Sequence, residues 1–167
     1  MKSHPAREPA ALPHTRSAPV PLLVLDTNVV LDWIAFNDVR VQPIAAAIER
    51  GALRAATSSA CLQELRRALA YPQVKLDAAA QDLAFERYLA HATTFEVPVS
   101  AEAADLPLCE DADDQKFLEL AWHTCANRLV TRDKALLKLA RRLAKSGRFA
   151  VVGPEACLLW LQGLPQT

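Results

Sequence analysis

Short apolar runs alternate with amphipathic stretches along most of this chain. Residues 22–25 form an apolar run that stops at Asp26, which is typical of a buried parallel strand. Further strands are predicted over 53–57, 94–99, 129–131 and 149–152, and helices over 28–36, 41–50, 58–71, 77–91, 113–125, 134–145 and 154–161. Strands that alternate with helices predict a mainly parallel sheet covered by helices on both faces, a three-layer α/β/α sandwich.

Capping residues and helix stops sharpen several of these boundaries. Asn28 can cap the first helix, and Gly51 stops the second. The dipeptide Tyr71-Pro72 ends the third, because the residue before proline is driven out of the helical conformation. In the helix over 77–91, we expect Leu83 and Tyr88 to face inward.

Length and composition limit the domain organisation. The chain has 167 residues, of which 51% are hydrophobic and 23% charged, enough for one domain with one core. Residues 1–20 are rich in proline, alanine, histidine and arginine without periodicity, so we expect a flexible tail before a domain over 21–162. The formal net charge of zero disfavours a protein that coats nucleic acid by bulk charge, but allows a local basic surface.

Cysteine spacing and hydropathy indicate the cellular compartment in which we expect the protein. The four cysteines are far apart and form no Cys-x-x-Cys pair, which disfavours a zinc site or a disulfide framework and favours free thiols in a reducing cytoplasm. The longest apolar stretch, 20–34, contains Asp26, Asn28 and Asp32 and is too polar to span a bilayer. We therefore expect a cytoplasmic protein that does not contact a membrane.

Three acidic residues stand where parallel α/β sheets place their ligands. Asp26 directly follows one predicted strand and Asp133 lies just beyond another, so both should reach the same edge of the sheet. Each could instead cap the helix that follows it. Glu64, in the helix after the second strand, would lie over the same edge, or would be a solvated residue beside Arg66 and Arg67.

A run of acids crowds the start of the helix over 113–125. Asp111, Asp113 and Asp114 would favour the helix dipole there, but a dipole needs only one or two charges. Together with the acids after the strands, they would form a cluster whose pKa values rise unless a cation neutralises it. Carboxylate oxygens suit Mg²⁺ or Mn²⁺, and such ions can polarise a phosphate for hydrolysis.

Four segments resemble motifs of the PIN-domain family, in its order and spacing over about 22–161. Val24-Leu25-Asp26-Thr27-Asn28 resembles its opening strand motif, and Ser58 to Leu65 its second motif, where a glutamate follows the second strand. Residues 111–121 are similar to the acidic helix start of one PIN subgroup, the toxin components of toxin–antitoxin pairs. Residues 129–133 resemble the closing motif.

The resemblance implies an α/β/α fold, an endoribonuclease activity that depends on Mg²⁺ or Mn²⁺, and often a separately encoded antitoxin protein. By position, Asp26, Glu64 and Asp114 match the metal-binding acids, Asp133 matches the fourth acid, and Thr27, Asn28 and Thr131 match the supporting polar residues. Ala112 stands where the subgroup usually has proline, so Asp111 and Asp113 stay alternatives to Asp114. The chemistry implied is hydrolysis of RNA phosphodiester bonds that leaves a 5′-phosphate.

A basic run over 128–148 could contact RNA phosphates near Asp133. The candidate contacts are Arg132, Lys134, Arg141 and Arg142. A solvated face of an amphipathic helix accounts equally well for these residues.

Two other functions compete with a nuclease. A non-catalytic PIN-like module would bind RNA or a protein, although such modules lose acids that this chain keeps. A phosphatase with an aspartyl nucleophile would need a second aspartate where Asn28 stands. The sequence leaves open the RNA target, action on DNA, the number of metal ions, the antitoxin and a homo-oligomeric state.

Overall fold

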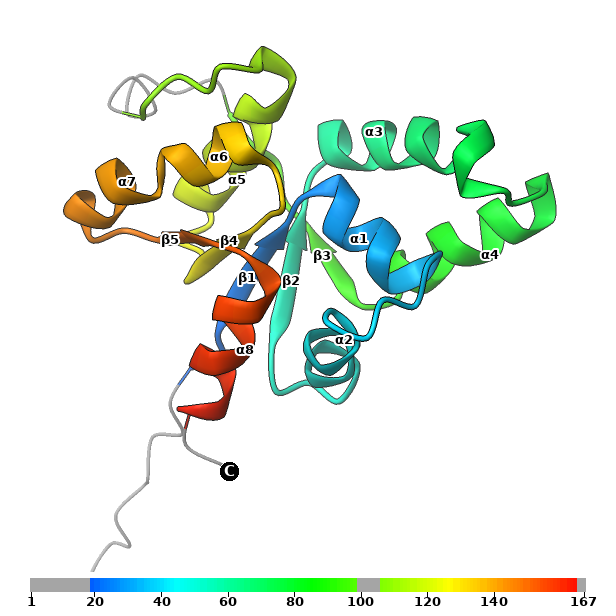
Figure 1. Cartoon of the computed structure of the whole chain (residues 1–167), viewed down its shortest axis with the longest axis horizontal. Coiled ribbons are helices and arrows are strands. Elements are labelled where there is room, and N and C mark those ends of the chain that lie inside the picture. Colours follow the sequence, from blue (N-terminus) through cyan, green and yellow to red (C-terminus); the bar gives the residue numbers. More distant parts are fainter. Residues whose placement is uncertain (1–18, 99–105, 165–167) are drawn as a thin grey trace, which may run out of the picture.

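The structure, a computed structural model, describes residues 19–98 and 106–164 (Figure 1). The predicted tail over 1–20 therefore lies almost entirely outside the described residues. Five parallel strands form one sheet in the order β3-β2-β1-β4-β5. The strands are β1 (Leu22–Leu25), β2 (Arg54–Thr57), β3 (Ala92–Thr94), β4 (Arg128–Val130) and β5 (Ala150–Val152).

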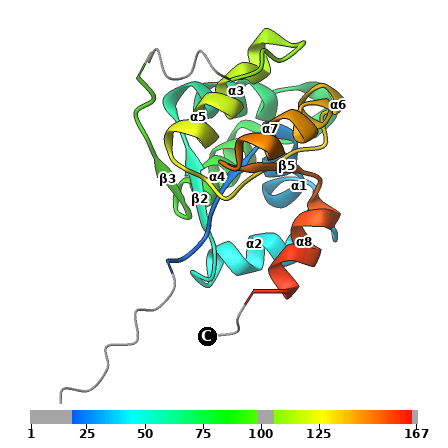
Figure 2. The same cartoon turned by 90° about the vertical axis from the view of Figure 1, so that its left-hand side faces the viewer.

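Helices cover both faces of this sheet (Figures 1 and 2). One face carries α1 (Thr27–Ile34), α2 (Gln42–Glu49), most of α3 (Ser59–Leu69), α4 (Ala78–Leu89) and α8 (Pro154–Gln162). The other carries α5 (Gln115–His123), α6 (Lys134–Lys138) and α7 (Ala140–Ser146). Two short 3₁₀ turns, η1 (Pro72–Val74) and η3 (Ala112–Asp114), follow α3 and precede α5.

Alternation along β1 builds the two cores. Leu23 and Leu25 belong to the apolar cluster under α1, α2 and α4, while Leu22 and Val24 belong to the cluster under α5, α6 and α7. A strand buried on both faces is apolar throughout, as the run over 22–25 is. The predicted three-layer α/β/α sandwich with a parallel sheet is confirmed.

Three local predictions need correction. The strand predicted over 94–99 is the shorter β3, Ala92–Thr94, and residue 99 lies outside the described part. The helix predicted over 134–145 divides at Leu139, whose N–H bonds back three residues to Leu136 instead of four. In α4, Leu83 is 74% exposed rather than inward, because the buried stripe runs through Ala84, Phe85 and Tyr88.

The strand order places the carboxyl ends of β1 and β4 at the centre of the sheet. From β1, the chain winds outward to β2 and β3 on one side and later to β4 and β5 on the other. The two halves diverge between β1 and β4, which leaves a crevice where open α/β sheets bind their ligands. No helix in the described part of the chain is long and apolar enough to cross a membrane.

Candidate functional site

Asp26 is a buried carboxylate at the crevice. It is 3% exposed, and its N–H donates to the Val130 carbonyl of β4 at 3.0 Å. One carboxylate oxygen, Oδ1, accepts from the N–H of Val29 at 2.8 Å and caps α1, while Oδ2 accepts from the Thr131 hydroxyl and from the Arg132 N–H. Asp26 is thus the residue that caps α1. The sequence had offered both Asp26 and Asn28 for this cap.

The turn after β4 holds the second carboxylate. Asp133 caps α6, since its Oδ1 accepts from the N–H groups of Ala135 at 2.6 Å and Leu136 at 3.2 Å. Its own N–H donates to the Thr131 hydroxyl oxygen at 2.9 Å. Thr131 therefore bridges Asp26 and the Asp133 backbone. Capping and a position at the crevice are compatible roles for both aspartates.

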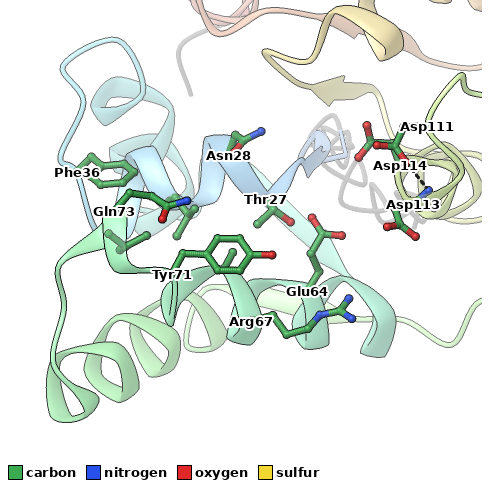
Figure 3. Close-up of a pocket in the computed structure, with 13 residues that line it drawn as sticks. Thr27, Asn28, Phe36, Glu64, Arg67, Tyr71, Gln73, Asp111, Asp113 and Asp114 are labelled. Atoms are coloured by element: carbon green, nitrogen blue, oxygen red, sulfur yellow. Dashed lines mark hydrogen bonds between the residues drawn. The ribbon is translucent and has the colours of Figure 1, made fainter.

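The remaining predicted acids line a groove of about 510 Å³ between α1, α3, η1 and η3 (Figure 3). Four of its lining residues are acids, and we call this part of the groove the acidic end: Glu64, Asp111, Asp113 and Asp114. Thr27 and Asn28, two predicted supporting residues, line the same groove, whereas Thr131 is buried beside Asp26. The fold thus gathers the acids of α3 and η3 close to the end of β1.

The electrostatics tie these carboxylates together. Partial burial, followed by the nearby charges of Asp133, Asp111 and Glu64, raises the pKa of Asp114 to about 6. Burial also raises the pKa of Asp26 despite its hydrogen bonds, and the charge of Asp133 raises it further. Asp133 therefore acts on both, and the surroundings of Asp26 and Asp114 disfavour the negative charge of these two carboxyls.

Lys116 partly compensates this charge. Its ammonium forms an ion pair with Glu64 and donates to the Asp113 carbonyl. The donor set is all carboxylate and hydroxyl oxygen, which fits a hard divalent cation. Within residues 19–98 and 106–164, however, no three acidic, histidine or cysteine side chains stand close enough for a preformed coordination shell. A bound cation would have to draw Glu64 from Lys116.

The four predicted RNA contacts do not line this groove. Arg132 instead pairs with Asp32 at 2.7 Å and with Asp38 at 3.3 Å. Lys134, Arg141 and Arg142 are exposed on α6 and α7, which cover the other face of the sheet. The basic run therefore contributes nothing to the lining of this groove, and its contact with RNA stays a prediction.

Sequence reasoning missed the other end of the groove. The same groove is also lined by four residues that were not predicted: Phe36, Arg67, Tyr71 and Gln73. The only signal for Tyr71 was the Tyr-Pro dipeptide, which indicated a helix end and nothing about a site. These residues lie at helix ends that only the packing of α1 against α3 brings together.

Comparison with known proteins gives the family. A model of the PIN domain matches residues 22–135. Among solved structures, the fold is similar to that of VapBC2 from Rickettsia felis bound to a DNA fragment from their promoter. That match has 13% sequence identity and a TM-score of 0.54, and covers 79% of this chain and 98% of the other. No curated protein sequence matches. With most of its length matched by the family model, and with acids placed at the carboxyl edge of its sheet, the chain belongs to the PIN-domain family.

Proposed function

We propose that this chain is a metal-dependent endoribonuclease and the toxin of a toxin–antitoxin pair. The observation that carries the proposal is the gathering of Glu64, Asp111, Asp113 and Asp114 along one groove, where burial and neighbouring carboxylates raise the pKa of Asp114 to about 6. Carboxylates that repel each other cost folding free energy, and proteins keep such arrangements chiefly at functional sites. Membership of the PIN-domain family supports nuclease chemistry, and the VapBC2 likeness supports the toxin role.

Asp26, Glu64, Asp114 and Asp133 would hold Mg²⁺ or Mn²⁺, with Asp111 and Asp113 as alternatives to Asp114. When bound, the ion supplies positive charge that polarises the scissile phosphate and activates water. The chain's own residues orient the acids. The Thr131 hydroxyl and the Val29 N–H fix Asp26, and the first turn of α6 fixes Asp133.

The substrate class is RNA, and the product carries a 5′-phosphate. We place the activity in the cytoplasm, where the four free cysteines, Cys61, Cys109, Cys125 and Cys157, stay reduced. A nuclease of this kind would harm its own cell, so we also propose a separately encoded antitoxin protein as partner.

One observation favours a second function, a non-catalytic PIN-like module that binds RNA or protein. Lys116 already forms an ion pair with Glu64, and the described residues contain no preformed coordination shell for a metal ion. In such a module the ammonium would replace the cation permanently. The two functions differ in their dependence on metal.

The test is a cleavage assay on structured and unstructured RNA with Mn²⁺, Mg²⁺ or EDTA. We expect cleavage with either metal, none with EDTA, and 5′-phosphate ends in the products. RNA left intact under all three conditions, at protein concentrations that saturate RNA binding, would establish the non-catalytic module instead.

The toxin role is tested separately in growing cells. We expect expression of the wild-type chain to slow growth and Asp26→Asn to relieve it at equal protein level. Equal growth inhibition by both forms would refute a nuclease-based toxin, but would leave the cleavage assay to decide the enzymatic activity.

A further inference from the structure

Two half-exposed aromatic rings line the groove: Figure 3 shows Phe36 at the end opposite the aspartates and Tyr71 between Phe36 and Glu64. Phe36 is 51% exposed and Tyr71 is 52% exposed, although both could gain free energy by burial. The acidic end does not involve these rings.

Hydrogen bonds hold the backbone that carries both rings. Phe36 follows α1, and its N–H donates to the Leu31 carbonyl at 3.0 Å. Tyr71 follows α3, where its N–H donates to the Ala68 carbonyl at 3.1 Å and its carbonyl accepts from Val74 at 2.9 Å. Leu31, Ala68 and Val74 are themselves buried groove residues, so the groove that contains the rings has an apolar floor. An aromatic side chain has only two torsions and loses little conformational entropy when it binds a flat partner.

Polar groups surround the rings on the side toward the acids. Figure 3 shows Gln73 between Phe36 and Tyr71, and the Tyr71 hydroxyl directed toward the acidic end. Arg67 is exposed, lines the same groove, and forms no ion pair with any described residue. Amide groups can hydrogen-bond to base edges, and a guanidinium matches a phosphate.

This combination fits a nucleotide better than an apolar peptide. A peptide helix or strand would be matched by mainly apolar walls, whereas here an amide, a guanidinium and carboxylates line the groove beside the two rings. A single-stranded nucleotide presents a flat base to stack, edges to hydrogen-bond and a phosphate for cations. The groove volume of about 510 Å³ lies within the range of sites for ligands of this size.

We propose that Phe36 and Tyr71 form a base-stacking subsite for a nucleotide of single-stranded RNA next to the scissile phosphate, with Arg67 contacting the RNA backbone. The inference rests on the proposed function, since it takes the acidic end as the place where the scissile phosphate lies. Unpaired bases can reach the rings and paired bases cannot. The subsite therefore gives the nuclease a preference for unpaired RNA.

The experiment measures RNA affinity and not cleavage. The full chain carrying Asp114→Asn is titrated into a short, unstructured, fluorescein-labelled RNA, and into the same RNA with a single abasic position moved along it. We expect Tyr71→Ala to weaken binding about 5- to 100-fold, Phe36→Ala to act in the same direction, and Tyr71→Phe to bind within about 2-fold of the parent. One abasic position should weaken the parent in the same way, and should have no further effect on Tyr71→Ala.

Leu83→Ala serves as the matched control, because it removes an exposed apolar side chain of α4 outside the groove. It should leave RNA affinity unchanged. Unchanged affinity in both Tyr71→Ala and Phe36→Ala, with unchanged melting temperatures, would overturn the subsite and leave the groove to another occupant, such as a peptide of an inhibitor. If the wild type binds RNA in a way that depends on Tyr71 but does not cleave it, the nuclease is refuted and the subsite is not.

Discussion

Two groups of charged side chains can be compared in this molecule, and Asp38 in one and Asp114 in the other are in opposite electrostatic states. In the first, which we call the ion-pair cluster, Asp32 and Asp38 face Arg40 and Arg132. Hydrogen bonds from Arg40 hold the pKa of the Asp38 carboxyl well below its usual value. At the acidic end of the groove, burial and neighbouring carboxylates raise the pKa of Asp114 to about 6.

The two groups differ in the source of the positive charge that neutralises their acids. Each acid of the ion-pair cluster has an arginine partner, so the protein neutralises the cluster itself. At the acidic end, Lys116 pairs with Glu64, and no described lysine or arginine forms an ion pair with Asp111, Asp113 or Asp114. A cluster that is neutral by itself contributes to the fold, while one that lacks positive charge attracts it from outside the chain. The comparison therefore separates the structural acids of this chain from its candidate ligands.

The largest expected effect is the loss of RNA cleavage in Asp114→Asn. The amide cannot replace a charged ligand, so we expect the cleavage rate to fall by about 100-fold or more. The melting temperature of the metal-free protein should stay the same or rise, because a repelled charge is removed. Asp82→Asn, which changes an exposed ion pair with Arg66, is the control and should retain full activity. A cleavage rate equal to that of the wild type would remove Asp114 from the site.

A second variant tests the structural side of the comparison. Arg132→Met leaves Asp32, whose side chain is 17% exposed, without its closest cation. We expect the free energy of unfolding, measured by urea denaturation, to fall by about 1–3 kcal/mol. The matched change Arg40→Met breaks a pair whose arginine is 53% exposed, and should cost less than about 1 kcal/mol. An effect of Arg40→Met as large as that of Arg132→Met would show that burial does not distinguish the two arginines.

The pH dependence of stability should distinguish the two groups as well. The pKa of Asp114 rises from 3.8 to about 6 on folding, so the folded protein binds this proton more tightly than the unfolded chain. Its contribution to stability is complete below pH 3.8 and is lost as the pH rises through about 6. We expect urea titrations of metal-free wild type to show this loss relative to Asp114→Asn, and millimolar Mg²⁺ to reverse it. Identical pH profiles of the two proteins would contradict the raised pKa.

The smallest expected effect concerns Lys116. Lys116→Met removes the ammonium from Glu64, so the acids repel each other more strongly and gain more from an added cation. We expect addition of Mn²⁺ to raise the melting temperature of this variant by more than that of the wild type. A smaller gain than in the wild type would show that Lys116 assists the cation instead of competing with it.

The sequence by itself determined the layered fold and most of the candidate acids. The run over 22–25 and the alternation of strands and helices are local patterns, and each follows from which side chains avoid water. Asp26 and Asp133 could be placed because a residue that follows a parallel strand must lie at the carboxyl edge of the sheet. Leu83 was misplaced because the inward face of α4 depends on contacts such as the Trp33–Tyr88 ring pair, with centroids 5.9 Å apart.

Only the tertiary structure decided which charges are paired and what shares the groove. Arg132 was predicted to contact RNA, yet it pairs with Asp38, 94 positions away in the chain. The ion pair between Lys116 and Glu64 likewise joins separate elements, and so does the groove that both Phe36 and Tyr71 line. Contacts of this kind depend on how α1, α3 and η3 pack around the carboxyl ends of β1 and β4. Local periodicity fixes each element, but carries no information about the distance between side chains on different elements.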